Sequence, residues 1–109
     1  MAYDEVLATR IRVQLPPGMD IREVKMFGGL CFLERGNMAF GVVRDELMVR
    51  VGKAGEQDAL GQPGARPMDF TGRPMPGMVY VSRKATDDDA GLGAWLERGL
   101  RHSGGLPAK

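Results

Sequence analysis

Cysteine, histidine and tryptophan are scarce in this chain of 109 residues, which contains one of each. A single cysteine, Cys31, cannot form a disulfide within the chain, and this favours a reducing compartment such as the cytoplasm. A structural zinc site needs four ligands drawn mostly from cysteine and histidine, whereas Cys31 and His102 supply two. We therefore expect no dedicated metal site and no cofactor.

Long apolar runs and an excess of one charge are also missing. No stretch approaches the ~20 apolar residues of a membrane helix, and the acidic start Met1–Glu5 lacks the basic and apolar regions of a secretory signal. We expect a soluble cytoplasmic protein that does not contact membranes. Fifteen basic and fourteen acidic residues give a net charge of +1, so composition gives no support to nucleic-acid binding, which usually needs a basic excess or face.

The apolar residues that are present follow helical and strand periods. They predict a first helix, four short strands, a short helix, a fifth strand and a last helix, at residues 3–15, 21–27, 30–33, 38–43, 47–51, 53–60, 78–81 and 86–103. The segment 61–77 holds four prolines and four glycines, which predicts an ordered surface loop. We expect one α+β domain over 1–109, an antiparallel five-stranded meander with two to three flanking helices, and a flexible tail at about 104–109.

Two adjacent glycines, Gly28 and Gly29, interrupt the strand pattern after Phe27. They lack the Gly-x-Gly-x-x-Gly spacing, and a strand follows them instead of a helix, so they do not predict a phosphate-binding loop. Glycines inside a strand pattern usually mark a bend or bulge, because glycine permits φ values that other residues resist. We interpret them as such a bend, with a partner-binding surface as the alternative. Gly36-Asn37 predicts a hairpin turn.

The loop from Arg66 to Met75 has the most unusual composition in the chain. Arg66 and Arg73, on a backbone stiffened by proline, could bind an anion through bidentate hydrogen bonds. Alternatively, one of these arginines pairs with Asp69, and apolar side chains anchor the loop to the core, namely Met68, Phe70 and Met75.

Nucleophilic and acid–base groups are few. Cys31 lies in the apolar run 30–33, which predicts a buried side chain and not a reactive thiolate. His102 lies near the end of the last helix, where an exposed cation is more typical than a general base. Because no catalytic constellation emerges, we expect no enzymatic activity.

The acidic run Asp87–Asp89 precedes the last helix. Carboxylates are favoured at helix N-termini, and Thr86 can cap this helix with Asp89 in the answering position of a capping box. We therefore favour a helix start over a site for a hard cation.

Five segments, in their order and spacing, carry a resemblance to a known family: Met1–Glu5, Lys25–Leu30, Gly36–Met38, Asp45–Val51 and Pro67–Met75. From the first residue to about position 101, the chain resembles the TfoX N-terminal-domain family. The resemblance implies an α+β domain with an antiparallel sheet and flanking helices. It also implies a link to TfoX (Sxy), a bacterial regulator of natural competence that acts with the cyclic-AMP receptor protein at promoters.

The longer regulators of this family carry a second, C-terminal domain, and we expect this chain to be a stand-alone N-terminal domain. The family supplies no agreed catalytic residues. Our first hypothesis is therefore a non-catalytic regulatory or protein-interaction module, whose partners include the transcription machinery. Its candidate contact surface joins the glycine bend to the arginine loop, and its residues are Phe27, Gly28, Gly29, Arg66, Asp69 and Arg73.

Two other functions stay open from the sequence. The first is nucleic-acid binding through phosphate contacts made by Arg50, Lys53, Arg66 and Arg73. The second is a small anionic-ligand site or enzyme in a loop pocket, where Arg73 holds the ligand and Asp69 is the candidate base. A homodimer is a further possibility, because an unpaired edge strand can pair across a twofold axis.

Overall fold

The computed structural model describes residues 3–109. Over that range it contains six strands and four helices, in the order α1 (Glu5–Gln14), β1 (Ile21–Met26), β2 (Gly29–Glu34), β3 (Asn37–Val43), β4 (Glu46–Arg50), α2 (Gly52–Leu60), β5 (Ala65–Phe70), β6 (Arg73–Val81), α3 (Arg83–Thr86) and α4 (Asp89–Gly104). The strands form one antiparallel sheet in the order β1-β2-β3-β4-β6-β5. The α+β class and the antiparallel sheet are confirmed.

The prediction of five strands in a simple meander was wrong in one region. The segment 61–77, expected to be a loop, forms β5 and the first part of β6. Proline is tolerated in an edge strand where its nitrogen faces solvent, because no ladder hydrogen bond is lost there, and β5 is an edge strand that carries Pro67. The chain therefore passes from β4 through α2 to the edge and returns along β6 beside β4.

Three hairpins share one turn geometry. Their central residues are Phe27-Gly28, Arg35-Gly36 and Thr71-Gly72, and both residues of each pair have positive φ, between 50° and 85°. Two-residue turns of this kind match the twist of the flanking strands, and glycine at the second position avoids the cost of a side chain there. The second turn was predicted one residue too late, because Asn37 is already the first residue of β3.

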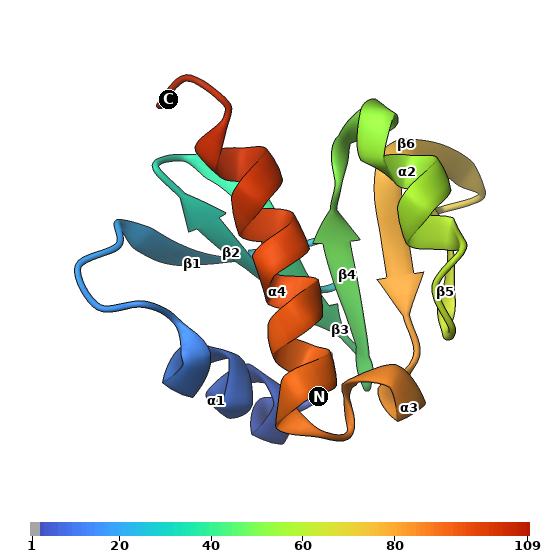
Figure 1. The fold of residues 1–109 in the computed structure, drawn as a ribbon, viewed down its shortest axis with the longest axis horizontal. Coiled ribbons are helices and arrows are strands. Elements are labelled where there is room, and N and C mark those ends of the chain that lie inside the picture. The colour runs from blue at the N-terminus through green and yellow to red at the C-terminus, as the bar shows by residue number, and fades with distance from the viewer. Residues whose placement is uncertain (1–2) are drawn as a thin grey trace.

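Helices cover one face of the sheet. In Figure 1, α4 crosses in front of the central strands, with α1 at the lower left and α2 at the upper right. Along β4, Leu47 and Val49 belong to the core cluster that includes Ile11 of α1 and Trp95 of α4. Within the described range, no helix is long and apolar enough to cross a membrane.

A second apolar cluster lies on strands and, together with its margin, contains six of the eight methionines. Its buried members are Cys31, Met38, Val43, Met48, Met68, Met78 and Tyr80. Met48 lies between Leu47 and Val49 in sequence, and side chains alternate between the faces of a strand, so this cluster occupies the face opposite the helices. Met26, Phe27, Leu33 and Met75 pack at its margin.

The start of α4 differs from the predicted capping box. Thr86 belongs to α3 and is 1% exposed, and its hydroxyl donates to the carbonyl oxygen of Arg83. Asp88 is the N-cap of α4, and its carboxylate accepts from Gly91 N at 3.3 Å. The acidic run is a helix start, as expected, with Asp88 and not Thr86 as the cap.

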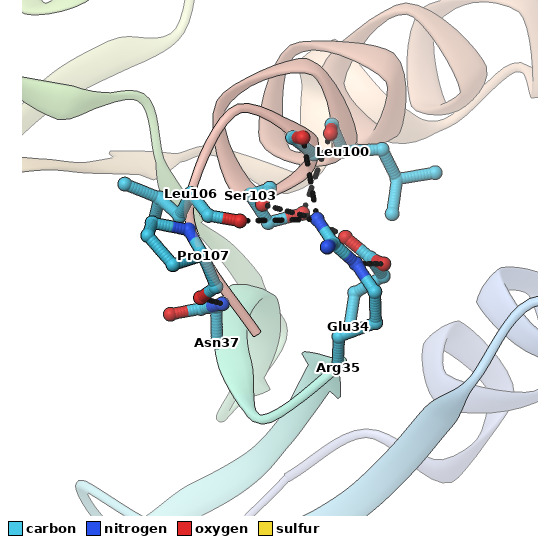
Figure 2. A network of polar contacts seen from close by, with 8 residues as sticks. Glu34, Arg35, Asn37, Leu100, Ser103, Leu106 and Pro107 are labelled. Carbon is cyan, nitrogen blue, oxygen red and sulfur yellow. Dashed lines mark hydrogen bonds and ion pairs between the residues drawn. The ribbon is translucent and has the colours of Figure 1, made fainter. Parts of the chain in front are cut away.

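A buried polar network joins the β2–β3 turn to the end of α4 (Figure 2). Glu34 is 5% exposed, and its carboxylate accepts from Arg35 Nε at 2.5 Å and from Ser103 Oγ at 3.0 Å. The Arg35 guanidinium also donates to three carbonyl oxygens, each at 3.2 Å, those of Ser103, Gly104 and Leu106. Carbonyls at the end of a helix have no intrahelical donor, so Arg35 supplies donors from outside the helix.

Residues 104–109, expected to be a flexible tail, continue from this network along the same turn. Lys109 N donates to the Arg35 carbonyl oxygen at 2.9 Å. The side-chain amide of Asn37 donates to the Pro107 carbonyl oxygen at 2.8 Å, as Figure 2 shows. The tail is therefore hydrogen-bonded to the β2–β3 turn, and its flexibility stays a prediction.

Candidate functional site

The glycine bend and the arginine loop meet through two aromatic rings. Phe27, in the β1–β2 turn, contacts Phe70 at the end of β5, with ring centroids 5.2 Å apart and planes at 85°. An edge-to-face contact of this kind is the favoured geometry for aromatic pairs. Phe70 remains 37% exposed, so the pair presents an apolar rim to solvent.

Arg66, on β5 beside this rim, is held on two sides. Its guanidinium forms a two-pronged ion pair with the Glu46 carboxylate, with hydrogen bonds of 2.5 and 2.7 Å. The same guanidinium lies over the Tyr80 ring, 4.8 Å from its centroid. The Tyr80 hydroxyl donates in turn to the Asp69 carbonyl oxygen at 3.1 Å. A planar guanidinium that makes two hydrogen bonds to one carboxylate orients both side chains, in addition to pairing their charges.

Neighbouring charges shift the pKa values of this pair. Hydrogen bonds from Arg66 lower the pKa of the Glu46 carboxyl below its ordinary value of 4.5; partial burial opposes this shift, and the charge of Arg44 adds to it. The Glu46 hydrogen bonds raise the pKa of Arg66, with smaller contributions from Tyr80 and Asp69. Charges of alternating sign therefore follow one another around the site, in the order Arg44, Glu46, Arg66 and Asp69.

These side chains surround a surface hollow of about 330 Å³. Its lining combines three aromatic rings with charged and hydroxyl groups, from Phe27, Val43, Arg44, Arg66, Asp69, Phe70, Thr71 and Tyr80. The hollow is polar and lies against the strand face that carries the methionine cluster, because Val43 and Tyr80 belong to both. We call it the aromatic hollow.

The family described as TfoX N-terminal domain matches residues 14–103. The chain belongs to this family. No curated protein and no solved structure matches the chain. The matched range contains every residue of the aromatic hollow, and it leaves out the Met1–Glu5 segment that was part of the predicted resemblance.

Three of the six predicted surface residues of this TfoX N-terminal domain line the aromatic hollow, namely Phe27, Arg66 and Asp69. Gly28 and Gly29 belong to the turn and to the start of β2 beside it, where they shape the backbone. Arg73 begins β6 and pairs with Phe70 across the β5–β6 hairpin. It does not belong to the described residues that line the hollow. The alternative that Arg66 or Arg73 pairs with Asp69 was wrong for Arg66, which pairs with Glu46, and the ion pairs of residues 3–109 include none between Arg73 and Asp69.

The loop anchors were predicted in part. Met68 is 2% exposed within the methionine cluster, and Met75 packs at its margin. Phe70 contacts Phe27 instead of entering the core. Phe70 was therefore not one of the anchors. It is the last residue of β5 before the Thr71-Gly72 turn, and that turn was not recognised in the sequence.

The four basic residues considered for phosphate contacts lie at separate places. Arg50 ends β4, whereas Arg66 pairs with Glu46 at the start of the same strand. Lys53 lies in the first turn of α2, and Arg73 lies at the β5–β6 turn. Because the Arg66 guanidinium already has a carboxylate partner, this distribution gives little support to a phosphate-binding stripe.

The remaining reactive groups lie away from the hollow or are buried. Cys31 is fully buried, and burial raises the pKa of its thiol to about 11. His102 is half-buried, and partial burial together with the charge of Arg50 lowers its pKa, so it is less often charged than the exposed cation that was predicted. Among the described residues, no cluster of three His, Cys, Asp or Glu side chains could hold a metal ion.

Sequence reasoning missed Val43, Arg44 and Tyr80, which line the hollow, and Glu46, which pairs with Arg66. Glu46 and Tyr80 follow strand patterns and carried no motif. Arg44 gave no sequence signal either, because its φ of 54°, which is unusual for a large side chain, is visible only in the structure.

Proposed function

We propose that this domain is a non-catalytic protein-interaction module with a regulatory role, and that a partner protein docks over the aromatic hollow. The Phe27–Phe70 contact carries the proposal, because it makes one continuous surface from two segments 43 positions apart. The rim beside it exposes Phe70, one of the few large apolar side chains left accessible.

The composition of this surface suits protein recognition. Phenylalanine, tyrosine and arginine are enriched in interface centres, where rigid side chains make most of the affinity. Arg66 and Tyr80 are already fixed by Glu46 and by the Asp69 carbonyl oxygen. A surface whose side chains are ordered before binding loses less conformational entropy on association.

The charges around the hollow favour a protein over a polyphosphate. Arg44, Glu46, Arg66 and Asp69 alternate in sign, and a phosphate backbone would meet two carboxylates among them. A protein surface that carries both positive and negative groups can complement these alternating charges, and the complementary pairs would fix the position of the partner on the hollow.

Membership of the TfoX N-terminal domain family supports a regulatory role, with components of the bacterial transcription machinery as the first partner class to test. Such a role would place the protein in the cytoplasm.

Site-specific photo-crosslinking in living bacterial cells tests the docking surface directly. A photo-reactive phenylalanine analogue replaces Phe70 in one variant and Val13 in a matched control. Val13 lies on α1 and is 79% exposed. We expect a discrete crosslinked partner from position 70 that position 13 does not give. Equal crosslinks from both positions, or none from position 70, would contradict the proposal.

Binding of the purified partner provides the quantitative test. Phe70→Ser and Arg44→Glu should each weaken binding at least about tenfold, the effect of losing ~1.4 kcal/mol at an interface centre. Arg73→Glu changes another exposed arginine, which lies outside the hollow, and should leave affinity within about twofold. A partner that loses affinity only with Arg73→Glu binds elsewhere.

A further inference from the structure

The outer edge of β1 is unpaired in the sheet, and none of the residues of β1 lines the aromatic hollow. The two edge strands of the sheet are β1 and β5. An unpaired strand edge offers a row of backbone donors and acceptors to another strand. We propose that β1 pairs antiparallel with β1 of a second copy of this chain across a twofold axis at Val24.

The opposite edge is unsuited to such pairing. Pro67 removes a backbone donor from β5, and the pairing of β5 with β6 is irregular between Pro67 and Asp69. Prolines and bulges are common features that prevent edge-to-edge association. In contrast, β1 pairs with β2 in an unbroken register over all six of its residues, and β1 contains no proline.

The hairpin turn determines which β1 residues point their backbone groups outward. A two-residue turn makes Met26 and Gly29 a hydrogen-bonded pair, and such pairs alternate along an antiparallel ladder. The hydrogen bond from Arg35 N to the Asp20 carbonyl oxygen, at 3.0 Å, continues the same alternation beyond the strand. Glu23 and Lys25 therefore direct their N–H and C=O groups away from β2. Both residues are exposed.

The charges on β1 select one register. With the twofold axis at Val24, Glu23 of each copy lies opposite the partner's Lys25, and each such pair is also a hydrogen-bonded pair. Moving the register by two residues places either two Glu23 side chains or two Lys25 side chains opposite each other. Like charges directly opposite are destabilising, and opposite charges stabilise the pair.

The side chain of Glu23 is already oriented for this role. Arg12 of α1 donates two hydrogen bonds of 2.8 Å to its carboxylate. The carboxylate has acceptor sites left for an ammonium group, and Arg12 holds it on the helix side of the sheet. Each interface half would thus present an Arg12–Glu23 pair to the partner's Lys25.

Charge reversal tests the register, with sedimentation equilibrium of the full chain at low salt as the measurement. We expect the wild-type chain to dimerise as its concentration rises from micromolar to millimolar. Glu23→Lys and Lys25→Glu each turn two attractive pairs into two repulsive ones and should each weaken dimerisation about tenfold or more. The double variant restores opposite charges and should recover part of the lost affinity, because a lysine at position 23 cannot accept the two hydrogen bonds from Arg12.

A second variant separates dimer loss from misfolding. Lys25→Pro removes an outward N–H that takes no part in the β1–β2 ladder, and proline is tolerated at such edge positions. It should abolish the dimer while the thermal unfolding midpoint of the monomer changes little. A wild-type chain that stays monomeric at millimolar concentration overturns the proposal. So does a dimer that Glu23→Lys, Lys25→Glu and Lys25→Pro all leave intact, because it would then form through another surface.

Discussion

The rings of Phe27 and Phe70 are in contact, although their hairpins lie at opposite edges of the sheet. Phe27 follows β1, Phe70 ends β5, and four strands separate β1 from β5 in the sheet order. Strands twist relative to their neighbours, and the twist accumulates across a sheet. The accumulated twist allows the two turns to meet, and Phe27 packs at the margin of the methionine cluster.

This contact should contribute to stability as well as to the proposed docking surface. Phe27→Ala and Phe70→Ala should each lower the free energy of unfolding by about 1–2 kcal/mol, less than for fully buried phenylalanines because both rings are partly exposed. The double variant should lose less than the sum, with a coupling of about 1 kcal/mol for an edge-to-face pair. Urea denaturation of the four proteins measures this cycle. Strict additivity would mean that the rings do not interact in solution.

The Arg66–Glu46 pair predicts an asymmetry between its two partners. The Glu46 side chain is 15% exposed and that of Arg66 is 49% exposed. Removing the arginine leaves a mostly buried carboxylate without its counter-ion, whereas removing the carboxylate leaves an arginine that can reach water. Arg66→Ala should therefore cost about 2 kcal/mol of unfolding free energy and Glu46→Gln about 1 kcal/mol or less.

The same pair predicts a pH dependence. Because the folded-state pKa of Glu46 is lowered, its contribution is complete above the unfolded-state pKa and is lost as pH falls through the folded-state value. The stability difference between the wild type and Glu46→Gln should thus be constant near neutral pH and shrink as pH drops below about 4.5. Denaturation curves at several pH values measure it. A difference that grows toward acid pH would contradict this assignment.

The Glu34–Ser103 hydrogen bond should make Ser103 intolerant of a small change. Ser103 is fully buried, and its hydroxyl donates to a carboxylate that is also buried. Ser103→Ala removes one oxygen atom but deprives a buried charge of a donor, which should cost about 2 kcal/mol. Ser103→Ala in a Glu34→Gln background should cost less, because a neutral amide needs the donor less. Equal costs in both backgrounds would remove the carboxylate from the explanation.

Hydrogen exchange can decide how firmly the tail is held. The Lys109 amide donates to the Arg35 carbonyl oxygen, and the Arg35 guanidinium binds the Leu106 carbonyl oxygen. If these bonds persist in solution, the Lys109 amide should exchange more slowly than an unstructured amide, and Arg35→Ala should abolish that protection. Full exchange in the wild type would support the flexible tail predicted from the sequence.

The elements with clear periodicity could be predicted from the sequence. Leu47 and Val49 alternate along one strand, and Leu92, Trp95 and Leu96 recur at helical spacing, so their local pattern identified β4 and α4. The hairpin β5–β6 was missed because proline and glycine suggested a loop. Their effect depends on position, since a proline in an edge strand costs no ladder hydrogen bond, and edge position is a property of the whole sheet.

The contacts of the aromatic hollow could not be predicted for a similar reason. Glu46 and Arg66 are 20 positions apart, and Phe27 and Phe70 are 43 positions apart. The first contact depends on the order β4-β6-β5, and the second depends on the twist that accumulates across the sheet. The spacing of residues along the sequence contains neither of these two properties of the sheet. The choice of Phe27, Arg66 and Asp69 as surface residues needed only the sequence, because they lie beside the paired glycines or in the segment with the most unusual composition.

The adjacent glycines Gly28 and Gly29 should respond very differently to alanine, because they are glycine for different reasons. Gly28 has a φ of +73°, and a Cβ there would meet no atom within 4 Å. Gly29 has an ordinary φ, but its Cβ would run into the Val42 carbonyl oxygen and lie 3.1 Å from the Val43 Cα atom. The first position is restricted by conformation and the second by space.

Gly28→Ala should therefore cost about 1 kcal/mol, the usual penalty for a side chain in left-handed backbone, and Gly28→Asn less, because asparagine tolerates that conformation. Gly29→Ala should cost roughly 3 kcal/mol or more, since backbone atoms of β3 would have to move and a packed sheet cannot relax freely. Chemical denaturation of the three variants gives this ranking. Similar costs for both alanines would show that β3 can withdraw from Gly29, and the close approach of β2 and β3 would then not explain this glycine.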